Sequence, residues 1–117
     1  MEAELADLLD VLDYRAIQIN QIELAKERFR VRRVLMWDGH SFDLTQEFIL
    51  YASARMAEED YAILLDRNEE PVLIEAGQKQ EFLAKMNTTY NEALNEYHDR
   101  YAKMKKARNS MEVIEAA

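Results

Sequence analysis

The chain has 117 residues and a net charge of −8, with 49% of its residues apolar and 32% charged. This composition excludes a disordered acidic tail, and the length sets an upper limit of one domain with a single core. Because cysteine is absent, disulfide frameworks and thiolate zinc sites are excluded as well.

Two glycines and one proline, Gly39, Gly77 and Pro71, divide the chain into long uninterrupted stretches. Each glycine lies where a helix-like pattern changes, and Pro71 lies between two short apolar runs that are typical of a β-hairpin. We therefore predict a helix-dominated α+β fold, with a long N-terminal helix, short β-hairpins around a central helix, and a long C-terminal helix. The expected parts of this single domain, residues 1–117, are a docking or oligomerisation helix 1–30, a small α+β module 31–108 and a tail 109–117.

The N-terminal segment repeats apolar residues at spacings of three, four or seven, which predicts an amphipathic helix from about Glu2 to Arg28. One stripe consists of Leu5, Leu8, Leu12, Ile19, Ile22 and Phe29. An adjacent set consists of Leu9, Ile17, Leu24 and Val31. Together they make an apolar face broader than a two-stranded seam requires, while Arg15 and Lys26 interrupt the heptad positions. We therefore expect a self-associating bundle or a subunit interface rather than an indefinitely long coiled coil.

The helical period is lost after Phe29, where β-branched and aromatic residues lead to Trp37. The following dipeptide, Asp38-Gly39, is a strong turn signal before a second short run that ends at Asp43. This pattern predicts a hairpin, although the apolar spacing also permits a helix that continues through Met36.

A central helix is expected next, ending near Glu59. Either Asp43 or Thr45 can cap its start, and Asp43 with Gln46 has the spacing of a capping box. The apolar run 61–65, a polar turn and the run 72–74 then predict a second hairpin.

The chain returns to a helical pattern from Gln78 to Arg108. One stripe there consists of Leu83, Met86, Tyr90, Ala93, Tyr97, Tyr101 and Met104. Because tyrosine keeps a polar hydroxyl at its tip, this face suits a partly wet subunit interface as well as a core, and we expect it to pack against the first helix or the hairpins. Residues 109–117 either add a short helix capped by Asn109 or fray.

The charges are arranged along the helices. Residues 2–13 contain five acids and no base, whereas residues 26–33 contain five bases and one acid. Acids at the start of a helix and bases at its end complement the macrodipole, which is the interpretation we favour over a phosphate-binding patch. Residues 43–75 argue against nucleic-acid binding, because they hold nine acids and only Arg55 and Arg67.

Few residues of the sequence are candidates for catalysis or metal binding. Asp38, His40, Ser41 and Asp43 have the residue types of a catalytic triad, but neighbours around one turn rarely converge in that geometry, so His40 is read as a turn residue on the surface. His98 lacks the spacing of paired metal ligands on a helix. Asp66, Asn68 and Glu70 mimic the start of a calcium loop, but Pro71 stands where that loop needs glycine. We therefore predict no enzyme, no catalytic residue, no metal site and no cofactor.

One resemblance extends over about Val31 to Arg108. It is carried by Trp37, Asp38-Gly39, the run from Ser41 to Glu47, a helix, an apolar strand, a polar turn, a second strand and a final helix. This order resembles a small domain of unassigned function that recurs in tail-fibre and fibre-assembly proteins of tailed bacteriophages, which has a similar Gly-x-x-Phe-Asp-Thr start. The chain differs from it in carrying Glu69-Glu70-Pro71 at the second turn and no Trp in the second strand.

The resemblance implies a structural or adaptor protein of a phage virion, in the tail fibre, baseplate or tail assembly, that acts by contact with other virion proteins or with itself. The interface candidates are Leu5, Leu8, Leu12, Ile19, Ile22, Phe29, Tyr90, Tyr97 and Tyr101. The alternative is a small acidic regulator that imitates the charge of nucleic acid and inhibits a host or phage protein. The resemblance implies a location in the virion, or in the host cytoplasm during assembly. No membrane or export signal is expected, because no apolar run approaches the roughly 20 residues of a membrane span and residues 1–10 lack the bases of an export signal.

Overall fold

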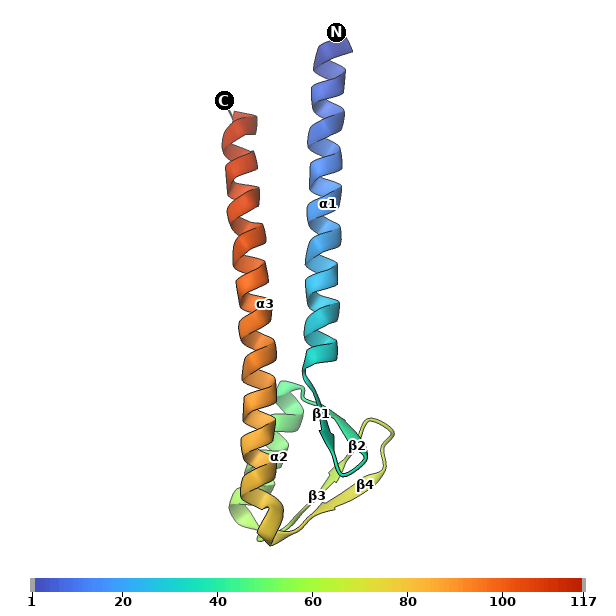
Figure 1. The fold of residues 1–117 in the computed structure, drawn as a ribbon, viewed down its shortest axis with the longest axis vertical. Coiled ribbons are helices and arrows are strands. Elements are labelled where there is room, and N and C mark those ends of the chain that lie inside the picture. Colours follow the sequence, from blue (N-terminus) through green and yellow to red (C-terminus); the bar gives the residue numbers. More distant parts are fainter. Residues whose placement is uncertain (1, 117) are drawn as a thin grey trace. The chain divides into compact units, whose positions relative to one another are not determined.

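The computed structural model describes the backbone of residues 2–116 and the side chains of residues 12, 16–17, 19–107 and 109. It has a mostly helical α+β fold with two small hairpin sheets and a long C-terminal helix, as the sequence predicts (Figure 1). The elements in chain order are α1 (Glu2–Arg32), β1 (Val34–Trp37), β2 (His40–Asp43), α2 (Gln46–Glu58), β3 (Ala62–Leu65), β4 (Pro71–Ile74), the 3₁₀ turn η1 (Ala76–Gln78) and α3 (Lys79–Ala116).

The chain divides into two compact units. One consists of residues 1–28 and 96–117, and the other of residues 29–95. The first contains most of α1 and the second half of α3, whereas the second contains both hairpins, α2 and the first half of α3.

The first hairpin settles the choice between helix and strand for residues 29–37. α1 ends at Arg32, and β1 begins two residues later at Val34. The turn residues Asp38 and Gly39 have φ values of 48° and 76°, the left-handed conformation that a two-residue hairpin turn requires. β1 and β2 are antiparallel, with Trp37 opposite His40.

The capping box predicted for Asp43 and Gln46 does not form the N-cap of α2. Thr45 is the N-cap, and its Oγ1 accepts a hydrogen bond of 3.1 Å from the backbone N–H of Phe48. Asp43 instead accepts a bond of 2.9 Å from Nε of Arg33. Asp43 is therefore held at the open end of the first hairpin, next to the end of α1.

The second hairpin and α3 follow the expected order. β3 and β4 are antiparallel, with Pro71 as the first residue of β4, a position where a strand tolerates the missing N–H. After η1, α3 continues without a break to Ala116, past the boundary that the sequence predicts at Arg108. The physical reason is that no glycine or proline follows Gly77, so nothing stops the helix.

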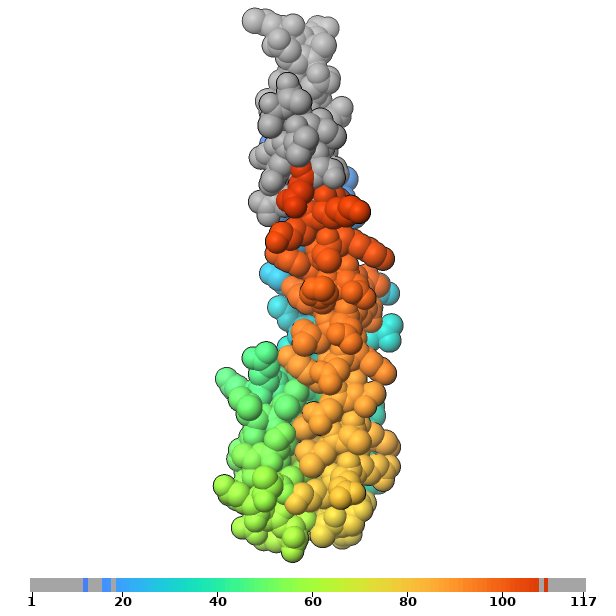
Figure 2. Space-filling model, turned by 90° about the vertical axis from the view of Figure 1, so that its left-hand side faces the viewer, coloured from blue at the N-terminus to red at the C-terminus, as the bar shows by residue number. Residues whose placement is uncertain are grey.

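The core of the 29–95 unit lies between the hairpins and the helices. Both hairpins lie on one side of α2 and the first turns of α3 (Figure 1), and these two helices lie side by side in the space-filling view (Figure 2). Phe82 of α3 is central, with its ring 5.2 Å from that of Trp37 and 5.6 Å from that of Phe42, both edge-on. The buried cluster comprises Leu35, Trp37, Phe42, Leu44, Ala52, Met56, Ala62, Leu64, Val72, Ile74, Phe82 and Met86.

Candidate functional site

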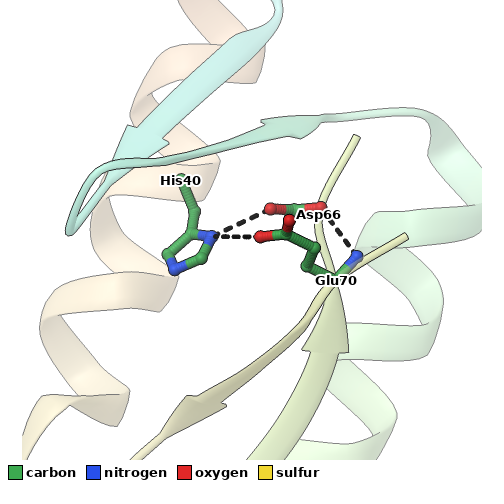
Figure 3. Close-up of side chains that lie close together, drawn as sticks. All are labelled: His40, Asp66 and Glu70. Carbon is green, nitrogen blue, oxygen red and sulfur yellow. Dashed lines mark hydrogen bonds and ion pairs between the residues drawn. The ribbon is translucent and has the colours of Figure 1, made fainter. Parts of the chain in front are cut away.

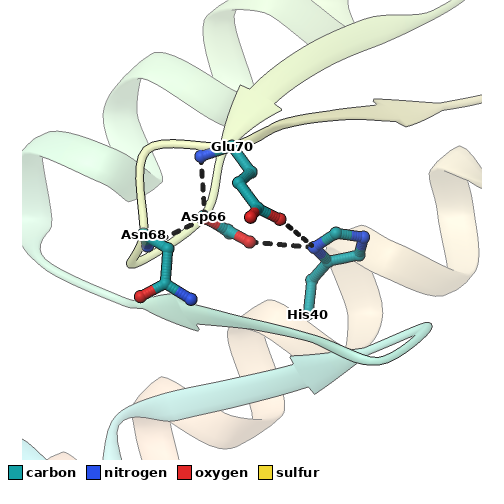
Figure 4. Close-up of polar contacts among 4 residues, drawn as sticks. All are labelled: His40, Asp66, Asn68 and Glu70. Atoms are coloured by element: carbon teal, nitrogen blue, oxygen red, sulfur yellow. Dashed lines mark hydrogen bonds and ion pairs between the residues drawn. The ribbon is translucent and has the colours of Figure 1, made fainter.

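The turn between β3 and β4 holds one carboxylate in a fixed position. Oδ1 of Asp66 accepts backbone hydrogen bonds from Asn68 (2.8 Å) and Glu70 (2.9 Å), and the Asp66 N–H donates to the carbonyl of Glu70 (3.0 Å). Aspartate favours turns because its side chain bonds in this way to the backbone that follows. The second carboxylate oxygen, Oδ2, is left facing away from the turn and toward His40 (Figure 4).

His40 meets this carboxylate from the other hairpin (Figure 3). Its Nδ1 lies 2.8 Å from Asp66 Oδ2, and because an ionised carboxylate only accepts, Nδ1 carries the proton of this bond. A second bond of 2.8 Å joins the N–H of Arg67 to the carbonyl of Ser41. The tip of the second hairpin is therefore bonded twice to β2.

Glu70 completes the cluster. Its Oε2 lies 4.0 Å from His40 Nδ1, and the potential ligand atoms of His40, Asp66 and Glu70 all lie within 4.8 Å of one another. The side chain of Asp66 is only 3% exposed, that of His40 is 32% exposed and that of Glu70 is 65% exposed. The site thus has a buried acid at its base, held by the turn, and an exposed acid at its rim.

The environment keeps Asp66 ionised. The hydrogen bond from His40 is the largest cause that lowers its pKa below the ordinary value of 3.8, followed by the backbone N–H of Glu70. Burial acts in the opposite direction, while the N–H of Asn68 and the charge of His40 add to the lowering. The carboxylate is therefore a ready acceptor at neutral pH, for a proton donor or for a cation.

The interpretation of His40 as a surface turn residue is wrong, because it is the first residue of β2 and is bonded to Asp66. Nor do the four residues with triad chemistry converge: Asp43 pairs with Arg33, and His40 pairs with an acid of the other hairpin. The sequence could not find this pair, since 26 residues separate its members and only the turn role of Asp66 has a local signal.

The interface candidates have different surroundings. Tyr90 is half-buried against the core, and its ring centroid lies 6.1 Å from that of Phe29. Ile22 and Tyr97 are also half-buried, whereas Leu12, Ile19 and Tyr101 are exposed, and Tyr97 and Tyr101 stack with centroids 6.4 Å apart. The side chains of Leu5 and Leu8 lie outside the described residues.

The adjacent apolar set on α1 points outward where it is described. Ile17, Leu24 and Val31 are 54%, 67% and 65% exposed. Residues seven apart on a helix differ in direction by only about 20°, so these three form one stripe. Ala25, which is buried, lies about 100° away from Leu24 around the same helix. The helix therefore has an apolar stripe on a face that none of the described side chains covers.

The outer face of the second hairpin is apolar as well. Ile63 and Leu73 are opposite each other across β3 and β4, as are Leu65 and Pro71, and all four are exposed. The alternate residues of the same strands are in the core, so this small sheet is apolar on both faces. An antiparallel sheet commonly leaves one face in water, but that face is usually polar, which makes this apolar outer face unusual.

None of the helices described is both long enough and apolar enough to cross a membrane. Comparisons of the chain with protein-family models, with curated proteins and with solved structures found no match.

Proposed function

We propose that this chain is a structural or adaptor protein of a tailed-phage virion and that it acts by protein–protein contact through α1. The observation that carries the contact function is the outward stripe of Ile17, Leu24 and Val31. The phage setting rests on the sequence resemblance of residues 31–108.

The stripe has the spacing that helix packing uses. Apolar residues repeated every seven positions place their side chains along one line, where a second helix can insert its own. Covering the exposed half of a Leu or Ile side chain contributes on the order of 1 kcal/mol, so several must be covered together to hold a partner. Leu12 and Ile19 are exposed as well, but they lie more than about 100° around α1 from this stripe and therefore belong to a separate line on the helix.

The charges of α1 favour a second copy of the same helix in antiparallel orientation. Residues 2–13 carry five acids and no base, and residues 26–33 carry five bases and one acid. Antiparallel pairing places the acidic half of one copy beside the basic half of the other, whereas parallel pairing places like charges together. For a pair of α1 helices, the charges therefore favour the antiparallel orientation.

The experiment is the mass of the purified full chain in solution, measured by light scattering over a range of protein and salt concentrations. We expect a dimer, or a larger oligomer built from such pairs, which dissociates as salt screens the charges. The double substitution Ile17→Asp and Leu24→Asp should yield a monomer with an unchanged circular dichroism spectrum.

The matched control places two aspartates on α2, at Leu50 and Tyr51, which are 70% and 55% exposed. This variant should assemble like the original chain. A chain that remains monomeric at every concentration would overturn the assembly proposal and favour the acidic regulator. Equal loss of assembly in the control would show that α1 is not the contact surface.

A further inference from the structure

We infer that His40, Asp66 and Glu70 bind a divalent transition-metal ion, with Zn²⁺ as the best match, and that the ion joins the two hairpins. The inference is independent of the contact function proposed for α1, since it concerns other residues in the other unit.

The distances are close to those of a coordinated ion. Two ligand atoms bound to one zinc at about 2.0 to 2.1 Å are about 3.3 Å apart in a tetrahedral site and about 2.9 Å apart when they are at right angles. Nδ1 of His40 and Oδ2 of Asp66 are 2.8 Å apart, so they need to separate by about half an ångström or less. Oε2 of Glu70, at 4.0 Å from Nδ1, needs to approach, which its largely exposed side chain allows.

The ligand types select the ion. An imidazole nitrogen with two carboxylates suits zinc and its neighbours among the transition metals, whereas Ca²⁺ and Mg²⁺ prefer sites made only of oxygen. Three protein ligands leave a fourth tetrahedral position for water. The exposure of Glu70 leaves a route by which the ion can enter.

Asp66 is prepared for this role by its turn. The N–H groups of Asn68 and Glu70 hold Oδ1, so Oδ2 is oriented before any ion binds, as hydrogen-bonded carboxylate ligands are in metal sites. The lowered pKa of this carboxyl means that no proton must be removed from it. Little reorganisation is then needed at the base of the site.

A bound ion and the hydrogen bond between His40 and Asp66 cannot be present together. The ion needs the lone pair of Nδ1, whereas the hydrogen bond needs a proton on the same atom. Binding requires neutral imidazole with its proton on Nε2, and a doubly protonated ring must release one proton to solvent. The metal therefore replaces the hydrogen bond as the link between hairpins, and its affinity falls as the pH is lowered.

The test is isothermal titration of the chelator-treated full chain with ZnCl₂ at neutral pH. We expect saturable binding of one ion per chain. Glu70→Gln, at an exposed position, should keep the fold and weaken binding by more than about tenfold, and His40→Gln should abolish it. The controls are Glu69→Gln, an exposed acid in the same turn, and His98→Gln, the other histidine, and both should bind as the original chain does.

A spectroscopic measurement identifies the bound atom. The ¹⁵N resonance of His40 Nδ1, and not of Nε2, should shift to the position of a metal-bound nitrogen when zinc is added. The absence of saturable binding, or binding that survives in His40→Gln and disappears in His98→Gln, would overturn the inference and leave the cluster as a hydrogen bond between hairpins.

Discussion

The two units of this chain use apolar residues in different ways. In residues 29–95, side chains from both hairpins, α2 and α3 meet in one buried cluster. In the other unit, Ala25 is the only buried residue among the side chains that are described, while Leu12, Ile17, Ile19 and Leu24 are exposed. Apolar residues stabilise a fold only when they are removed from water. Residues 29–95 are therefore stabilised by a core of their own, whereas the described apolar side chains of the other unit add stability only if a partner covers them.

The sharpest test of this comparison makes the same substitution in each unit. Leu44 is fully buried in the core, so Leu44→Ala should lower the free energy of unfolding by about 2 to 5 kcal/mol. Leu24→Ala, on the exposed stripe of α1, should change it by no more than about 0.5 kcal/mol in dilute solution. Urea denaturation measures both changes. Similar losses would mean that the stripe on α1 is ordinary core.

Low pH should destabilise the core unit, residues 29–95, because it protonates Asp66. The pKa of Asp66 is lower in the folded chain than its ordinary value of 3.8, so its stabilisation is fully present above about pH 4 and is lost as the pH falls through the folded pKa, below 3.8. We expect Asp66→Asn to be less stable than the original chain at neutral pH, with the difference shrinking below pH 4.

The fluorescence of Trp37, the single tryptophan, reports on this unit, because its side chain lies in the core cluster. Urea midpoints measured by this fluorescence across the pH range give the comparison. Asp60→Asn, at an exposed position of the same unit, is the control. A difference between Asp66→Asn and the original chain that stays constant down to pH 2 would contradict this assignment.

The smallest expected effect is the difference in unfolding free energy between alanine substitutions at the two glycines. Gly39 has a φ of +76°, where a Cβ is strained even though nothing lies within 4 Å, so Gly39→Ala should cost about 1 to 2 kcal/mol. Gly77 has open space as well and a backbone conformation that other residues adopt, so Gly77→Ala should be neutral or slightly stabilising. Urea denaturation measures both values. Equal costs would show that the turn of the first hairpin is not what requires Gly39.

Local signals predicted several elements of the core unit. The Asp38-Gly39 turn marked the first hairpin, and Thr45 was one of the two expected caps of α2. The apolar runs on either side of the 66–70 turn became β3 and β4. These features depend on the conformational preferences of a few adjacent residues, which is why the sequence reveals them. The end of α3 was missed, because no breaker marks it.

The sequence by itself determined the helix-dominated α+β class, both hairpins and the uneven charges of α1, because each depends on residues that are close together in the chain. Only the tertiary structure decided which apolar residues are covered and which polar groups meet. Ile63 and Leu64 are both apolar, yet one is exposed and the other buried, because the sheet has a helix layer on one face. His40 and Asp66 are joined because two hairpins pack together, and no local preference encodes a contact across 26 residues.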